Sequence, residues 1–378
     1  MMKKILAVAL ASAFAAPAFA DTANVNVYGV INVGVESVDN GAERKSRVTT
    51  GNNAAIGFKG SEDLGGGMKA NWQVETNLSI DGDGNVATAN AGNGALNGTR
   101  NVWGGLSGGW GEVRIGVHDT PYKMSTGRLD SFVATLGDYN TLLGAGDGAN
   151  ASGLFDLRTG NTIAYISPNL SGFQLAGAYV MSSENGVAAG ADNGKAYSLS
   201  ATYTAGPLFV TAAYEDHKLY PTGATGASTS GGVVILNNGA APSNDRDAWK
   251  IGAGYKFGDL EVGAIYEKID LGTNNDWSTW FLKADYTMGA IKLKAAYAKA
   301  DESASGANNG AKHFALGADY SFSKRTMLQF TYSKVDNDGT AAAGGNWVLS
   351  QGTNTVGTTT SVAGTDASGY GVQMVHRF

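Results

Sequence analysis

The chain has 378 residues, no cysteine, and 33 acidic against 27 basic side chains, so its formal net charge at pH 7 is −6. An acidic chain lacks the basic surface that nucleic-acid binding requires, and a chain without thiols forms neither disulfides nor thiolate metal sites. Glycine is common, with 55 residues, which is about twice its average share.

The first twenty residues, MMKKILAVALASAFAAPAFA, have the pattern of a secretory signal peptide. Lys3 and Lys4 precede an apolar stretch, and small residues in an alanine-x-alanine arrangement follow it. We therefore expect cleavage of residues 1–20 before Asp21, which leaves residues 21–378 as one domain. The apolar stretch is shorter than the roughly 20 residues that a spanning helix needs, and the mature chain has none that long. If the mature chain lies in a membrane, it must cross as a closed β-barrel.

Apolar and polar residues alternate in many segments of the mature chain, which is the pattern of β-strands with one apolar face. In MKANWQVETNL, for example, Met68, Trp72 and Val74 share one face, whereas Lys69 and Glu75 lie on the other. We predict sixteen strands of about ten residues, the length that a tilted strand needs to cross a bilayer. They lie in residues 25–36, 47–60, 68–78, 100–106, 112–118, 158–166, 173–181, 196–204, 208–217, 248–257, 260–268, 279–286, 291–299, the hairpin 312–334, and 370–378.

Short connections alternate with long ones between the predicted strands. The short ones include SGGWG, TAGP and TMGA, and the long ones occupy residues 37–46, 80–98, 119–157, 181–194, 218–246, 269–276, 300–311 and 335–368. Short turns at one end and long loops at the other describe an up-and-down barrel. Aromatic residues such as Tyr320 and Phe322 end the apolar series, as in the aromatic girdles of membrane barrels. We therefore predict an all-β fold, a sixteen-stranded antiparallel transmembrane β-barrel, with a soluble β-sandwich as the alternative.

Several motifs resemble those of a known family, the trimeric general porins of the Gram-negative outer membrane, in the branch typical of β-proteobacteria and neisserial bacteria. They are VYGVINVGVE, GFKGSEDLGGGMKANWQVE, RNVWGGLSGGWGEVRIG, NTIAYISPNLSGFQLAGAY and GVQMVHRF, and they run along nearly the whole mature chain. The resemblance implies a homotrimer among outer-membrane lipids and lipopolysaccharide, with a water-filled channel for small hydrophilic solutes and ions in each barrel. It also implies that the long third loop, residues 119–157, folds into the lumen, and that Phe378 is the aromatic end signal for the outer-membrane insertion machinery.

Strand parity predicts which charged residues face the water-filled side, provided that no bulge intervenes. Ile56 and Phe58 fit the outward side of their strand, and the same argument applies to the other strands. By this rule the inward basic residues are Arg47, Lys59, Arg100, Arg114, His118 and Arg158, and Glu75 is an inward acid. Arg100 is included on the condition that Trp103 faces outward.

In the resembled family, basic wall residues at positions that match Arg47, Arg100 and Arg158 face acids on the inserted loop. The matching loop acids in this chain would be Asp130 or Asp138. Charges at a constriction select ions by sign. We therefore expect a preference for anions.

One departure from the family leaves the charge of the constriction open. The family often has a basic residue just before the third loop, where this chain has Val117 and His118. The alternative to anion preference is a lumen of solvated charges with little selectivity. Several further inward positions are acidic, among them Glu36, Glu215, Glu261, Glu267, Asp285 and Asp319.

Catalytic and metal-binding functions find little support in the sequence. The four histidines show no paired ligand spacing, and DGDGN at residues 81–85 lacks the closing glutamate of a calcium loop. No G-x-S-x-G or P-loop motif occurs, so we expect no enzyme activity, no metal and no cofactor. An outer-membrane enzyme and an adhesive barrel are the alternatives from other classes, although sixteen strands enclose more space than side chains fill. A substrate-specific channel, for example for phosphate or organic acids, is the alternative within transport.

Overall fold

The computed structural model describes residues 25–41, 43–51, 53–81, 96–144, 155–181, 195–221, 228–230, 233–235, 243–272, 276–303, 309–339, 347–351, 354–355 and 365–378. The expected signal peptide, residues 1–20, lies outside the described residues, as does most of the DGDGN segment.

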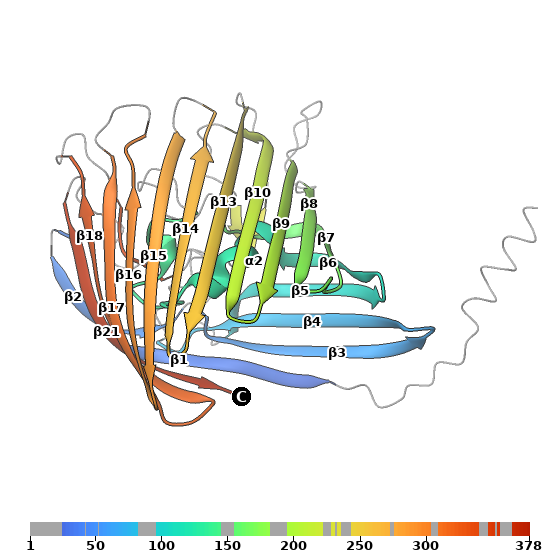
Figure 1. Cartoon of the computed structure of the whole chain (residues 1–378), viewed down its shortest axis with the longest axis horizontal. Coiled ribbons are helices and arrows are strands. Elements are labelled where there is room, and N and C mark those ends of the chain that lie inside the picture. The colour runs from blue at the N-terminus through green and yellow to red at the C-terminus, as the bar shows by residue number, and fades with distance from the viewer. Residues whose placement is uncertain are drawn as a thin grey trace, which may run out of the picture.

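The described residues form a closed antiparallel β-barrel of sixteen wall strands (Figure 1). Consecutive wall strands pair with each other, and β21 pairs with β1, which closes the ring. β2 and β3 both pair with β1 and together count as one wall strand. The wall strands are β1 (Asn26–Asp39), β2 (Arg44–Thr50), β3 (Ala55–Gly65), β4 (Met68–Leu78), β5 (Leu96–Gly108), β6 (Gly111–Asp119), β7 (Arg158–Ile166), β8 (Phe173–Met181), β9 (Lys195–Ala205), β10 (Leu208–Pro221), β13 (Ser243–Phe257), β14 (Leu260–Asp270), β15 (Asp276–Met288), β16 (Ile291–Ala300), β17 (Ala311–Ser321), β18 (Thr326–Asn337) and β21 (Ala367–Arg377). Shorter strands are β11 (Ser228–Ser230), β12 (Val233–Ile235), β19 (Ser350–Gln351) and β20 (Asn354–Thr355).

Side chains of the wall strands alternate between an exposed apolar face and an enclosed face. In β17, for example, Phe314 is exposed whereas His313 and Ala315 are buried. Aromatic residues of the exposed face also contact one another, as Tyr266 and Trp280 do with ring centroids 4.4 Å apart. An apolar outer face of this extent is unfavourable in water and favourable in lipid. The predicted transmembrane barrel is therefore confirmed.

The predicted long loop at residues 37–46 is wrong. β1 continues to Asp39 and β2 starts at Arg44, and the ladder between them runs from Val33 opposite Thr50 to Asp39 opposite Arg44. The strands extend because cross-strand partners, including the Asp39–Arg44 ion pair at 3.5 Å, continue the pairing beyond the apolar residues. Residues 37–39 and 44–46 are therefore parts of β1 and β2 despite their polar composition.

The predicted strand at residues 47–60 is interrupted at residues 51–54. The N–H of Gly51 donates to the carbonyl oxygen of Asn32 at 2.9 Å, and the N–H of Ala54 turns back to the carbonyl oxygen of Gly51 at 2.8 Å. This local turn replaces the regular ladder, so two shorter strands, β2 and β3, follow each other along β1.

The segment after β6 is folded into short helices. It contains α2 (Pro121–Thr126) and the 3-10 helices η1 (Gly127–Leu129) and η2 (Tyr139–Thr141). The hydroxyl of Thr120 caps α2 by accepting the N–H of Lys123 at 3.3 Å, and Pro121 suits the first helical position because it has no N–H to satisfy. Among the described residues, no helix is long and apolar enough to cross a membrane.

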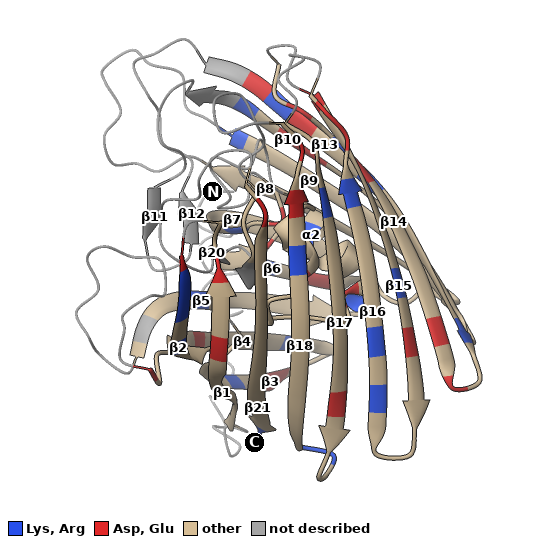
Figure 2. Ribbon diagram, turned by 90° about the vertical axis from the view of Figure 1, so that its left-hand side faces the viewer, with Lys and Arg blue, Asp and Glu red and all other residues tan. Residues whose placement is uncertain are grey.

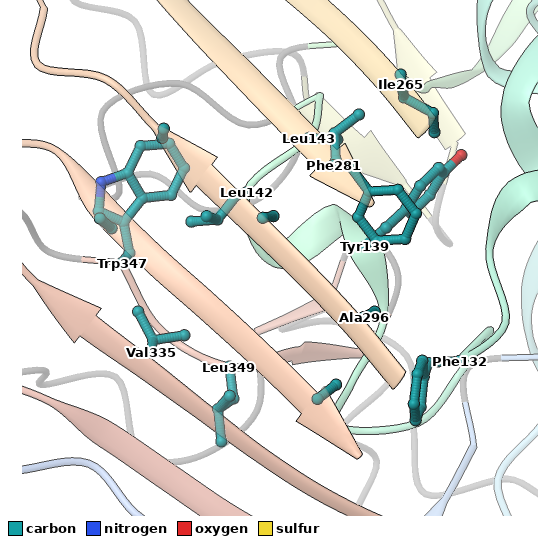
Figure 3. Packing of buried hydrophobic residues seen from close by; sticks show 14 of the residues in the cluster. Phe132, Tyr139, Leu142, Leu143, Ile265, Phe281, Ala296, Val335, Trp347 and Leu349 are labelled. Atoms are coloured by element: carbon teal, nitrogen blue, oxygen red, sulfur yellow. The ribbon is translucent and has the colours of Figure 1, made fainter. Parts of the chain in front are cut away.

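Apolar side chains of this segment pack against the enclosed face of the wall (Figure 3). Tyr139 and Phe281 of β15 meet edge to face with ring centroids 5.9 Å apart. Leu129 lies over glycines of β13 and β14, and a Cβ atom on Gly254 would be 2.9 Å from Leu129 Cδ2. Residues 120–144, the longer described part of the third loop, are therefore held against the inside of the barrel.

Candidate functional site

Arginines on the enclosed face of β2, β5, β6 and β7 are each paired with an acid of the same wall. The pairs are Arg47 with Glu36 (2.6 Å), Arg100 with Glu75, Arg114 with Glu112 (2.6 Å), and Arg158 with Asp119 (3.2 Å). We call these four arginines the basic wall. The expected partners were acids of the third loop, so their pairing with acids of their own wall was not predicted.

Arg100 reaches the enclosed face in a way that simple parity did not predict. Trp103 was expected to face outward, but it lies opposite Gln73, and the guanidinium of Arg114 lies over its ring at 4.2 Å. Trp103 therefore faces inward. The register between β4 and β5 shifts after Val74, and this bulge returns Arg100 to the same side as Trp103.

Glu75 is held in place by neutral donors as well as by Arg100. Its Oε2 accepts the hydroxyl of Tyr28 at 2.9 Å, and Gln73 Nε2 donates to the same hydroxyl at 2.8 Å. Lys59 is exposed, and its ammonium lies 5.1 Å from the centre of the Tyr28 ring. Lys59 and Arg100 therefore flank one hydrogen-bonded group of polar side chains.

Asp119 connects the basic wall with the third loop. Its Oδ1 is 3.2 Å from Arg158 Nη2 and 3.5 Å from Nζ of Lys123 in α2, and its Oδ2 accepts Asn101 Nδ2 at 2.8 Å. This ion pair joins Lys123 of α2 to the end of β6, the strand that precedes the third loop. Three cationic groups, those of Arg158, Lys123 and the nearby Arg100, share the field of one carboxylate.

His118 is an uncharged part of the wall. Its Nδ1 lies 2.6 Å from the carbonyl oxygen of Asp119 and its Nε2 lies 2.9 Å from Arg114 Nη1. Because a carbonyl oxygen can only accept, Nδ1 carries the proton and Nε2 accepts from Arg114. His118 is 3 % exposed, so it orients Arg114 and adds no positive charge to the lumen.

The two loop acids differ in their surroundings. Asp138 is 2 % exposed, and its carboxylate accepts the N–H groups of Ala134 at 2.9 Å and Asn140 at 3.0 Å. Burial raises the pKa of Asp138 to about 6. Asp130 accepts the N–H of Phe132 at 2.8 Å and remains half-buried. Asp138 is therefore a brace of the loop, and Asp130 is the loop acid with access to water.

A buried group of polar side chains fastens the loop to β13 and β14. We call Tyr122, Asp156, Lys250 and Glu267 the loop clamp. Tyr122 Oη donates to Glu267 Oε1 at 2.7 Å, Lys250 pairs with Asp156, and the Lys250 ammonium lies 4.0 Å from the Tyr122 ring centre. From strand parity we expected Glu267 to be an inward, solvated acid, and Lys250 was not predicted as a site residue. In the structure both are buried, with exposures of at most 1 %.

Charges of both signs also alternate on β14 to β17 (Figure 2). Lys283 Nζ is 2.6 Å from Glu261 Oε1, and Lys294 Nζ is 2.8 Å from Asp319 Oδ1. Lys283 and Lys294 are nearly inaccessible, with side-chain exposures of 3 % and 1 %, whereas the acids are more exposed. Lys292 of β16 is the exception, with an exposure of 40 % against 2 % for its partner Asp285. This side of the wall therefore presents accessible groups of both signs to the lumen.

On the side of β1 to β7 the relation is reversed. Arg47 is 26 % exposed against 1 % for Glu36, and Lys123 is 28 % exposed against 18 % for Asp119. The pairs of Arg100 and Arg114 follow the same order, and that of Arg158 does not. Across the described residues, no group of three or more histidine or acidic side chains could hold a metal ion.

A closed sixteen-stranded barrel with an apolar outer face and a charged interior is the architecture of an outer-membrane diffusion channel. A family model described as Gram-negative porin matches residues 7–340. The chain belongs to this family, and it is located in the Gram-negative outer membrane.

Individual relatives agree with this assignment. Outer membrane porin protein 32 of Delftia acidovorans is 29 % identical over 71 % of this chain and 70 % of its own length. Major outer membrane protein P.IB of Neisseria meningitidis serogroup B is 34 % identical over 57 % of this chain, which spans 60 % of that relative. The solved anion-selective porin from Comamonas acidovorans has 25 % identity and a TM-score of 0.73, covering 94 % of this chain and all of that one.

Proposed function

We propose that this barrel is a water-filled channel for the passive diffusion of small hydrophilic solutes and ions, with a weak preference for anions. The observation that carries the preference is the exposure of the ion pairs between β1 and β7, where the cation is more exposed than its acid in the pairs of Arg47, Arg100, Arg114 and Lys123. A solute in the lumen therefore meets the positive member of each of these pairs first. The solved Comamonas relative, which is anion-selective, supports the same sign.

The constriction in this proposal lies between the basic wall and the third loop. Residues 120–144 pack on the opposite inner face, so the loop fills that side and leaves the basic wall open to solutes. The constriction residues are then Arg47, Lys59, Arg100, Arg114, His118, Arg158, Glu75 and Asp130, with Asp138 acting through the loop's shape. The field across this gap orders polar solutes.

The assembled form in this proposal is a homotrimer in contact with outer-membrane lipids and lipopolysaccharide, after removal of residues 1–20. A solved relative of the same fold, OmpT of Vibrio cholerae, is described in a trimer form. The apolar outer face provides the surface that either lipid or a second barrel would cover.

Arg100→Ala is expected to lower the chloride-to-potassium permeability ratio by about threefold, equivalent to about 0.7 kcal/mol between the barriers of the two ions. The substitution removes a cation and leaves Glu75 with a larger uncompensated charge. The reversal potential of purified protein in a planar bilayer under a salt gradient measures the ratio. Arg325→Ala, in an exposed turn, is the matched control, and an equal ratio in both variants would remove Arg100 from the selectivity argument.

Phe378→Ser is expected to reduce the amount of folded protein in the outer membrane severalfold while leaving refolding in detergent unchanged. The backbone of Phe378 exchanges two hydrogen bonds of 3.1 Å with Gly29, which a serine retains, and the residue is 43 % exposed. The ring lies over Gly29 and is stacked with the ring of His376, with centroids 6.5 Å apart. Because the residue remains partly exposed, we expect the ring to be available to the insertion machinery and its loss to be tolerated by the finished barrel. Loss of refolding in detergent would instead assign the ring a structural role.

A further inference from the structure

A recess opens in the enclosed wall on the short-turn side of the basic wall. Its volume is about 410 Å³, and its lining includes Lys59, Asn71, Gln73, Trp103 and Arg114. These residues lie on β3 to β6, close to the turns that join β3 to β4 and β5 to β6. Because short turns face the periplasm in barrels of this kind, the recess lies at the periplasmic end of the constriction.

The recess carries a positive excess and an unused donor. Lys59 and Arg114 supply two positive charges against the one negative charge of Glu112, which is already paired with Arg114. Arg114 Nε is buried and has no hydrogen-bond partner in the part of the chain that the structure describes. The Arg114 side chain as a whole is 23 % exposed. Nη1 and Nη2 each carry two N–H groups, of which His118 and Glu112 take one apiece, so the guanidinium can still donate to an oxyanion.

The remaining lining fits a hydroxylated organic body. Asn71 Nδ2 donates to Glu112 at 3.0 Å, and Gln73 Nε2 donates to Tyr28 at 2.8 Å. Asn71 Nδ2 also donates to Ser107 Oγ at 2.9 Å, which engages both of its N–H groups and leaves its carbonyl oxygen as an acceptor for a hydroxyl donor. Gln73 offers its carbonyl oxygen and a second N–H. The Trp103 ring, which also contacts the Arg114 guanidinium and His118, supplies a flat apolar surface for carbon atoms.

We propose that this recess is a binding site for small hydroxylated oxyanions, in which a carboxylate or phosphate group contacts Arg114 and Lys59 and hydroxyl groups donate to Asn71 and Gln73. The proposal rests on the proposed channel function and adds to it a binding station at the short-turn end of the constriction, with which it shares Lys59 and Arg114. The channel then retains such solutes longer than it retains chloride.

The test uses trimers or monomers of the full protein in a planar bilayer with potassium chloride, to which gluconate or glycerol 3-phosphate is added. Each probe is expected to cause resolved interruptions of the chloride current. Lys59→Gln is expected to shorten their duration about tenfold, as loss of one charge-assisted hydrogen bond implies. Lys292→Gln, the matched loss of a lysine on the inner face of β16, which the recess does not include, should leave the duration unchanged.

Further outcomes separate the possible sources of binding. Trp103→Ala is expected to shorten the gluconate interruptions, and Trp103→Phe to restore most of their duration. If Lys59→Gln shortens the interruptions by gluconate alone, the site binds carboxylates. If it shortens those by glycerol 3-phosphate alone, the site binds phosphate esters. Equal effects of Lys59→Gln and Lys292→Gln would overturn the site, because general electrostatics would then explain the binding. Normal chloride current without any interruption overturns the site and leaves the channel intact, whereas the absence of chloride current overturns the channel itself.

Discussion

Gly254→Val is expected to reduce the single-channel conductance to roughly half, because the added side chain pushes the third loop toward the centre of the lumen. A Cβ atom at this position would lie 2.9 Å from Leu129 Cδ2, and one at Gly252 would lie 2.7 Å from Leu129 Cδ1. The wall behind these glycines is a hydrogen-bonded ladder. Leu129 is 1 % exposed and has little room to turn aside, so we expect the loop that carries it to move. Stepwise conductance of purified protein in a planar bilayer measures the effect.

Two variants make this result specific to the contact. Gly104 lies on β5 with nothing near its added Cβ, so Gly104→Val introduces the same side chain into a strand without touching the loop. Leu129→Ala in the Gly254→Val background removes the atoms that collide and should restore much of the conductance. A wild-type conductance in Gly254→Val itself would show that Leu129 does not set the position of the loop.

Lys250→Met is expected to weaken the attachment of the third loop by about 3–5 kcal/mol, the usual consequence of leaving one partner of a buried ion pair uncompensated. Lys250 and Asp156 are both fully buried, and Lys250 also lies over the Tyr122 ring. We expect the loop to become accessible to protease and the open-channel current to become noisier. Limited proteolysis and bilayer recording of the folded protein measure these two changes.

The double variant Lys250→Met with Asp156→Leu separates charge burial from packing. Replacing a whole buried ion pair with apolar residues is often neutral or stabilising, so the double variant should resist protease better than Lys250→Met. If the double variant were as sensitive as the single one, the clamp would depend on the shape and hydrogen bonds of the two polar side chains.

The barrel could be predicted from the sequence because its physical cause is local. A strand between lipid and water must alternate every second residue, and the alternation in β17 is visible in HFALGADY without any knowledge of its neighbours. The residues at which strands begin and end were harder to predict from the sequence. Asp39 and Arg44 have the composition of a loop, and only their pairing across β1 and β2 makes them part of the ladder.

The sequence predicted which charged residues of the site face inward, but it did not predict their ion-pair partners. Parity placed Arg47 and Arg114 on the inner face, yet it contains no information on which acid lies opposite. Arg100 lies inward although Trp103 does too, because a bulge between β4 and β5 changes the count of residues. No single sequence reveals such a bulge, since the extra residue has no characteristic composition.

The loop clamp illustrates a second limit. Glu267 looks like an ordinary lumen acid in LEVGAIYEKID, and Tyr122 looks like an ordinary loop residue in DTPYKM. They meet at 2.7 Å only because the segment after β6 lies along the inner face of the wall as far as β14. Such contacts between distant segments depend on the path of the loop, which periodicity cannot predict.

The pairing of β21 with β1 determines the order in which this barrel can be completed. Every other wall strand can pair with a neighbour that is close in sequence, whereas Gly29 and Phe378 come from opposite ends of the described chain before they exchange hydrogen bonds. Closing this seam carries the largest entropy of loop closure, so we expect it to be the slow and final step. Until that step, β1 and the last paired strand each present an unsatisfied edge that would join to other chains. These edges therefore need protection from pairing with other chains until the C-terminal strand has been synthesised and has paired with β1.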